Sequence, residues 1–152
     1  MQESISAQPQ QATAARQASL IEWSTAYGVG VEIIDDQHQG LVDVLNAIHK
    51  GINDGWNKEQ TTTALLKLVD DTLVHFATEE SMMQVHHYPK DDAHENRHAN
   101  LIQRMEQHIQ QYNQDPDISK AEVFAFFERW LLEHILKDDK PLGEFLVRHG
   151  VT

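Results

Sequence analysis

Apolar residues recur at intervals of three and four along most of the chain, a spacing typical of amphipathic helices. The pattern predicts four helices, at about residues 36–53, 60–86, 91–113 and 119–137. The expected inward positions are Leu41, Val42, Leu45, Ile48 and Ile52 in the first, Leu65, Leu68, Val69, Thr72, Phe76 and Met83 in the second, Leu101, Ile102, Met105, Ile109 and Tyr112 in the third, and Val123, Phe127, Trp130, Leu131 and Ile135 in the fourth. No long stretch alternates between apolar and polar residues as a half-buried strand would. The sequence therefore predicts an all-α fold.

Short turn signals separate the predicted helices. The segment "NDGW" at 53–56 ends the first helix, Pro89 stops the second, and "DPD" at 115–117 ends the third. Pro141 and Gly143 are expected to end the fourth pattern and to leave a short tail. Because the connections are only a few residues long, neighbouring helices should run antiparallel, which predicts an up-down-up-down four-helix bundle with an N-terminal arm.

Two helix starts carry capping signals. Ser119 and Glu122 have the spacing of a capping box, in which each side chain bonds the other residue's backbone N–H. Asp91 or Asp92 is expected to cap the third helix, since a short acidic side chain can accept a hydrogen bond from the first free backbone N–H groups.

The length of 152 residues fits one domain with a sizeable core. Residues 1–20, rich in Gln, Ala and Ser, are expected to form a flexible N-terminal extension, followed by a four-helix domain at 21–152, with a loose arm up to about residue 34. The N-terminus lacks the basic start and apolar stretch of a signal peptide. No apolar run approaches the ~18 residues of a membrane span.

Composition narrows the possible partners and raises the possibility of metal binding. The formal net charge of -12, without a Lys/Arg cluster along the sequence, argues against nucleic acid and anionic membranes. Cysteine is absent, which excludes disulfides and thiolate metal sites and fits a reducing compartment, so we expect a cytoplasmic protein. The unusual feature is ten His against only 12 Lys plus Arg. Histidine is the commonest metal ligand, so its placement on the helices is informative.

Seven polar side chains fall on the predicted apolar stripes: His38 on the first helix, His75 and Glu79 on the second, His94 and His98 on the third, and His134 and Asp139 on the fourth. Residues four apart share a helix face. The seven lie at the start of the first and third helices and toward the end of the second and fourth. These ends are at the same level in an antiparallel bundle, so the seven side chains should converge on one interior point.

Convergence of this kind points to a metal centre. Burying unpaired polar groups costs roughly 2 kcal/mol or more each, a cost that a bound cation removes. Taken singly, each residue has a simpler interpretation, such as a surface pair for His75 and Glu79; the joint pattern is what favours metal. Five histidines and two carboxylates are too many for one four-coordinate zinc. Between two six-coordinate metals, five histidines, two bridging carboxylates and one bridging oxygen would fill eleven of twelve positions. This donor mixture suits iron or manganese.

The segment "HENRH" at 94–98 also has the form His-Glu-x-x-His, the motif of zinc peptidases. The longer version of that motif wants glycine where Leu101 stands and histidine where Arg104 stands. A peptidase would also leave the polar residues of the other three helices unexplained. A ferritin-like site fits no better, because it needs Glu-x-x-His on two helices and only Glu95 with His98 has that spacing.

Four segments together resemble the hemerythrin family, and most closely its single-domain bacterial members, the bacteriohemerythrins. They are "DDQH" ending at His38, "HFATEE" from His75, "HENRH" from His94 and "WLLEHILKDD" ending at Asp139. The resemblance covers about residues 21–146 and includes the family's spacings His-x3-Glu, His-x3-His and His-x4-Asp. The opening "IEWSTAYGVGVEIIDDQH" is similar to the family's aromatic-containing arm, which would pack against the bundle.

The resemblance implies two iron ions (Fe2+/Fe3+) joined by a bridging oxo or hydroxo group. One iron would be held by His94, His98 and His134. The other would be held by His38 and His75 and would keep the open position. The carboxylates of Glu79 and Asp139 would bridge the two irons, and an apolar oxygen pocket would be formed by Leu41, Phe76, Trp130 and Leu131.

The function implied by the resemblance is reversible binding of dioxygen for storage, delivery or buffering, by a protein that is not an enzyme. Two alternatives stay open at this stage: oxygen or redox sensing, and a diiron redox enzyme acting on peroxide or nitric oxide. The expected pocket offers no proton donor, which counts against turnover. A fused signalling domain would favour sensing, and we expect none within these 152 residues.

Overall fold

The computed structural model describes residues 21–152, and the predicted extension at 1–20 lies outside the described residues. The described part is helical and contains no strand. Its elements are the 3-10 turn η1 (Thr25–Tyr27), the helices α2 (Glu32–Asn53), α3 (Lys58–Val85), α4 (Asp91–Gln114) and α5 (Lys120–Glu133), the π-helical segment η2 (His134–Asp139) and the helix α6 (Lys140–Arg148). No described helix combines the length and apolar character needed to cross a bilayer. The predicted all-α class is confirmed.

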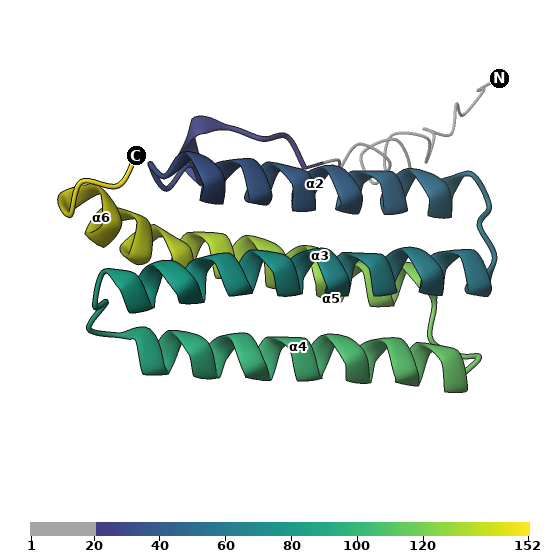
Figure 1. Cartoon of the computed structure of the whole chain (residues 1–152). Helices are drawn as coiled ribbons and strands as arrows, with labels where there is room; N and C mark the ends of the chain where they lie inside the picture. Colours follow the sequence, from purple (N-terminus) through teal and green to yellow (C-terminus); the bar gives the residue numbers. More distant parts are fainter. Residues whose placement is uncertain (1–20) are drawn as a thin grey trace, which may run out of the picture.

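The four long helices run antiparallel in chain order, as Figure 1 shows. Helix α2 packs against α3 and α5, and α4 packs against the same two helices. The predicted up-down-up-down bundle is therefore confirmed. The start of α2, the end of α3, the start of α4 and the segment η2 all lie at one end of the bundle, together with α6 (Figure 1). We call this the cluster end.

The apolar stripes predicted from the sequence form the core. Nearly all of the predicted inward residues are buried; Ile52, Leu101 and Ile102 are half-buried and pack on the edge of the core. A second, smaller apolar group closes the cluster end: Val29, Val31, Ile34, Met83, Tyr88, Leu142 and Leu146. We call it the end cap. The polar residues of the cluster end therefore lie between two apolar groups along the bundle axis, the main core on one side and the end cap on the other.

One of the two predicted helix caps is confirmed and the other is wrong. Ser119 and Glu122 form the predicted capping box at the start of α5. At the start of α4, the cap position is Lys90 and no side chain caps it. Asp91 and Asp92 lie instead inside the first turn. There, their negative charges are favoured by the partial positive charge of the helix N-terminus, without a cap hydrogen bond.

The prediction that Pro141 and Gly143 end the fourth helix is wrong, because the chain continues through η2 into α6. Pro141 lies in the first turn of α6, a position that tolerates its missing N–H. Gly143 marks a close contact and not a helix end. A Cβ at this position would lie 2.4 Å from the carbonyl oxygen of Val29. Glycine therefore lets the N-terminal arm lie directly against α6.

The arm itself is packed over residues 21–31, so the expectation of a loose segment up to residue 34 is wrong for its described part. The Asn46 side chain accepts a hydrogen bond from Ile21 N (2.9 Å) and donates one to Ile21 O (2.8 Å). Further along, Val29 N donates to Asp35 Oδ1 (2.7 Å). These bonds satisfy backbone groups of a segment without regular structure, which fixes it on α2.

Candidate metal centre

The structure brings all seven of the predicted metal-binding side chains together at the cluster end. His38 comes from α2, His75 and Glu79 from α3, His94 and His98 from α4, and His134 and Asp139 from η2. Every one of them is at most 2 % exposed. Buried ionisable residues are rare in proteins unless they are paired or bind a metal, so this concentration requires a chemical explanation.

The seven residues form two overlapping groups whose candidate ligand atoms lie within 4.8 Å of one another. The three-His group contains His94, His98 and His134, and the two-His group contains His38 and His75. Both groups include Glu79 and Asp139. A shared carboxylate is what two neighbouring metal ions need as a bridge.

Asp139 lies between the two groups and presents one oxygen to each. Its Oδ2 is 2.6 Å from His38 Nε2 and 3.2 Å from His75 Nε2. Its Oδ1 is 3.0 Å from His134 Nε2 and 3.4 Å from His94 Nε2. This is the arrangement of a carboxylate that can bridge two cations.

Glu79 also contacts both groups. It follows His75 by one helical turn on α3, which places the two side chains on the same face. Its Oε1 is 2.7 Å from His75 Nε2 and 3.5 Å from His134 Nε2, and its Oε2 is 3.3 Å from His94 Nε2. Glu79 can therefore serve as a second bridge.

The π-helical segment η2 explains how His134 and Asp139 reach the same point. In an α-helix, residues five apart differ in direction by about 140°, since each residue turns the helix by about 100°. A π-helix closes its hydrogen bonds between residues five apart, which brings these two side chains to one side. Sequence periodicity missed this segment; the five-residue spacing within an otherwise helical pattern was the available signal.

Three cluster histidines hydrogen-bond outward through Nδ1: His75 to Gln37 Oε1 (2.8 Å), His98 to Glu80 Oε1 (3.0 Å) and His134 to Asp138 Oδ2 (3.2 Å). With Nδ1 as the donor, the lone pair of Nε2 faces the centre of the cluster. Such outer partners orient imidazole ligands and raise their basicity. Sequence reasoning missed all three acceptors, although each stands next to a cluster residue in the chain.

The two carboxylates are held in their ionised form. Burial and the charge of Asp139 act to raise the pKa of Glu79, but close contacts with cluster histidines, first among them His134, outweigh both effects and lower this pKa to about 2. Burial likewise acts against ionisation of Asp139, and the charge and close contact of His134 hold its pKa well below the usual value. Both carboxylates are therefore available to a cation without first losing a proton.

The histidines differ in their affinity for protons. Burial lowers the pKa of His98 to about 3, so its imidazole is neutral. Burial also opposes protonation of His75, but hydrogen bonds to Asp139 and Glu79 raise the pKa of that imidazole to about 9. In the metal-free protein, protons on such histidines balance the carboxylates, and a metal cation binding at Nε2 would replace them.

The donor set fits a metal ion by a further criterion. Among the residues that the structure describes, nine buried side-chain nitrogen and oxygen atoms have no hydrogen-bond partner. Six of them are candidate ligand atoms of this cluster: both oxygens of Glu79, Oδ1 of Asp139, and Nε2 of His94, His98 and His134. An unsatisfied buried polar group costs about 1–3 kcal/mol, and coordination to a cation removes that cost.

Aromatic side chains surround the histidines. Phe76 is stacked on His98, with ring centroids 3.6 Å apart, and the ring of Trp130 is parallel to His134 at 5.8 Å. The two remaining residues of the predicted oxygen pocket, Leu41 and Leu131, are buried in the same core cluster as Phe76 and Trp130. Phe76 and Trp130 thus lie against the cluster histidines, all four residues belong to one apolar core cluster, and their role as an oxygen pocket stays a prediction.

Glu95, the general base of a zinc peptidase motif, belongs to neither group of candidate ligands in the described part of the chain. His94 and His98 instead point toward histidines and carboxylates of other helices. A peptidase site needs the glutamate and a substrate cleft beside the metal, so the arrangement gives no support to the zinc hydrolase interpretation.

Comparison with known proteins adds independent evidence. The family model described as "Hemerythrin HHE cation binding domain" matches residues 29–146. The bacteriohemerythrin of Methylococcus capsulatus is 30% identical over 129 residues, which cover 84% of this chain and 98% of that protein. The bacteriohemerythrin of Stenotrophomonas maltophilia is 29% identical over 131 residues, covering 86% of this chain and 84% of the relative.

Solved structures agree with the sequence comparison. The crystal structure of wild-type hemerythrin superposes with a TM-score of 0.75 at 29% identity, covering 84% of this chain and 98% of the other. The family match spans all seven cluster residues, and the bundle that positions them is shared. The chain therefore belongs to the hemerythrin family.

Proposed function

We propose that this chain binds dioxygen reversibly at a diiron centre and serves in oxygen storage, delivery or buffering. The observation that carries the proposal is that two groups of histidines share both Glu79 and Asp139. Two six-coordinate irons bridged by these carboxylates and by one oxo or hydroxo group would have eleven of twelve positions filled. The two-His group would then keep one position for a small ligand.

In this proposal, His94, His98 and His134 hold one iron, and His38 and His75 hold the other. When bound, the iron pair supplies the electrons for reversible dioxygen binding. Donors of this kind, imidazole with carboxylate, suit iron. The outward hydrogen bonds of His75, His98 and His134 fix the ring orientations that such a centre requires.

The role of the surrounding apolar residues is to exclude water. Leu41, Phe76, Trp130 and Leu131 are each at most 5% exposed. None of the four carries a titratable group, so none can deliver a proton to a ligand at the open position. A dry site without a proton donor favours release of unchanged dioxygen over its reduction. This supports a carrier over the alternative of a diiron enzyme acting on peroxide or nitric oxide.

The test is metal content combined with an optical spectrum. The purified protein is reduced without air, exposed to oxygen and then purged with argon. We expect two irons per chain and a visible charge-transfer band that appears with oxygen and fades on purging, over repeated cycles. Two irons that oxidise at once to a stable ferric form would favour sensing or redox catalysis instead. One zinc per chain and no colour would overturn the proposal.

A further inference from the structure

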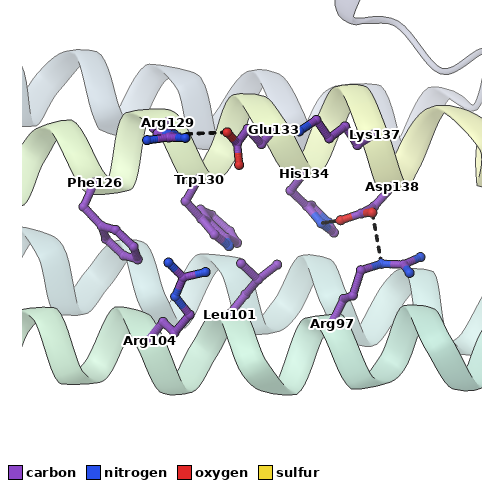
Figure 2. A pocket seen from close by; sticks show the side chains of 10 residues that line it. All are labelled: Arg97, Leu101, Arg104, Phe126, Arg129, Trp130, Glu133, His134, Lys137 and Asp138. Atoms are coloured by element: carbon purple, nitrogen blue, oxygen red, sulfur yellow. Dashed lines mark hydrogen bonds and ion pairs between the residues drawn. The ribbon is translucent and has the colours of Figure 1, made fainter.

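A pocket of about 470 Å³ lies on the surface between α4 and α5, beside the three-His group. Figure 2 shows its lining side chains, which come from α4 on one side and from α5 and η2 on the other. Four basic residues line it: Arg97, Arg104, Arg129 and Lys137. They are four of only 12 Lys plus Arg in a chain of net charge -12, so this is a local concentration of positive charge on an acidic protein.

The two acidic residues of the lining do not cancel this charge. Arg97 Nε is 3.0 Å from Asp138 and Arg129 Nε is 3.1 Å from Glu133 (Figure 2). Arg104 and Lys137 form no ion pair within residues 21–152. Four basic and two acidic side chains leave a formal excess of two positive charges in the lining, with Lys137 and Arg104 both close enough to act on the Glu133 carboxylate.

The pocket wall also contains a buried hydrogen-bond donor without a partner. Trp130 lines the pocket and is 5% exposed, and its Nε1 makes no hydrogen bond among the described residues. The nitrogen edge of its ring is directed toward Leu101, which also lines the pocket (Figure 2). An indole N–H can only donate. Any partner of this nitrogen is therefore an acceptor, and because the atom is buried, a ligand oxygen would reach it only if the side chains around it shift.

The remaining wall is apolar and aromatic. Phe126, Leu101 and Trp130 form it, and the guanidinium carbon of Arg104 lies 5.5 Å from the centre of the Phe126 ring. Small-molecule sites typically have volumes of about 300–1,000 Å³ and combine apolar walls with a few polar groups. The combination of apolar wall and cationic rim fits an organic anion better than a bare inorganic ion.

We propose that this pocket binds a small organic anion, with its carboxylate or phosphate groups held by Arg104 and Lys137 and its apolar body against Phe126 and Trp130. The pocket adjoins the metal cluster, since Asp138 forms an ion pair with Arg97 and accepts a hydrogen bond from His134. The site is defined by its lining residues and not by the identity of the metal. A negative result for anion binding would therefore leave the proposal of oxygen binding unaffected, and a negative result for oxygen binding would leave the anion proposal unaffected.

The test is isothermal titration calorimetry of the iron-loaded full chain at low ionic strength. The probes are benzoate, phthalate and inorganic phosphate, with benzamide as the neutral counterpart of benzoate. We expect one site per chain for benzoate or phthalate and none for benzamide. The double variant Arg104→Met, Lys137→Met should weaken binding about tenfold or more, because hydrogen bonds between charged groups are stronger than those between neutral groups. The matched control is Arg148→Met, an exposed arginine on α6 outside the pocket, which should bind as the parent does.

Three outcomes would overturn the proposal. The first is no saturable binding of either organic anion, or binding of inorganic phosphate alone. The second is equal affinity in the double variant and the parent, with circular dichroism showing both folded. The third is a change in the optical spectrum of the ferric centre when the anion is added, if this change is the same in the double variant. Such a result would mean that the anion binds to the metal and not to the pocket. Trp130→Phe provides a further check, as loss of the indole donor should weaken binding several-fold in a site built as described.

Discussion

The two halves of the metal cluster differ in how firmly they are supported. In the three-His group, His98 and His134 donate outward to the carboxylates of Glu80 and Asp138. Their rings also lie face to face with Phe76 and Trp130. In the two-His group, His75 donates to the neutral amide of Gln37. One histidine of each half, His38 and His94, has no partner for Nδ1 in the described part of the chain.

If metal ions occupy both halves as proposed, this difference indicates that the two positions have different tasks. Charge-assisted hydrogen bonds to carboxylates are stronger than bonds to an amide and raise the basicity of the imidazole more. The three-His group is therefore built to keep its ligands fixed. The two-His group has fewer ligands and weaker outer support, which is suitable for a metal that exchanges a ligand. Its His38 lies beside the N-terminal arm, where the ring of Trp23 is 6.4 Å away.

Removing a shared carboxylate should have the largest effect on bound iron, because this change takes a ligand from both halves of the cluster at once. Glu79→Ala deletes a donor common to both groups, so we predict loss of both irons and a lower melting temperature, because bound metal stabilises the folded state by mass action. Iron per chain, measured after desalting, checks this. Glu95→Ala on α4 is the control and should keep two irons; retention of two irons by Glu79→Ala would refute the bridging role.

The outer acceptors allow the two halves to be compared directly. We predict that Glu80→Ala weakens iron binding by about 10–100-fold and that Gln37→Ala weakens it less, since outer partners of this kind contribute to metal affinity in proportion to their hydrogen bond. Competition with an iron chelator measures both variants in parallel. Glu80→Gln keeps an acceptor and should fall between Glu80→Ala and the parent. A larger loss in Gln37→Ala would reverse the ranking of the two halves.

Helical periodicity was sufficient to predict the bundle and the placement of most polar residues on its inner face. His75 with Glu79, and His94 with His98, are each four apart, so their faces could be read directly from the sequence. The relation of Asp139 to His134 depends on η2, whose wider turn departs from the α-helical period, and the five-residue spacing of the two residues was its only sign in the sequence. The outer acceptors could not be predicted because contacts such as Glu80 with His98 depend on how two helices are rotated against each other.

The continuation of the fourth helix could not be predicted for a related reason. Pro141 and Gly143 are usual signs of a helix end, and only the tertiary context reveals that proline occupies a first turn and glycine a contact with Val29. The residue pattern alone indicated a loose arm, and only the family resemblance implied a packed one, because its order comes from hydrogen bonds to side chains such as Asn46 and Asp35, and not from a repeating pattern. Long-range contacts decided each of these features.

A smaller effect is expected from the contact between α6 and the arm, at the end of the bundle that holds both halves of the metal cluster. Gly143→Ala would place a Cβ 2.4 Å from Val29 O, and relief of this clash should destabilise the fold by about 1–3 kcal/mol. The matched control is Gly40→Ala in α2, where a Cβ meets nothing within 4 Å. That change should stabilise by about 0.5–1 kcal/mol, because alanine is the better helix former. Urea denaturation measures both; effects of the same sign would contradict the assigned contact.

The smallest effect should come from the attachment of the arm to α2. Asn46→Ala removes both hydrogen bonds to Ile21, so we predict a loss of about 1–2 kcal/mol in the free energy of unfolding. Asn46→Asp keeps an acceptor for Ile21 N but loses the donor, and should be intermediate. If the arm supports only the two-His group, competition with a chelator will remove iron from Asn46→Ala in two steps. The more weakly held iron will leave at a lower chelator concentration than in the parent. The other iron will leave at the same concentration as in the parent. An equal weakening of both irons would mean that the arm stabilises the whole cluster, and the division between its halves would then be one of ligand number alone.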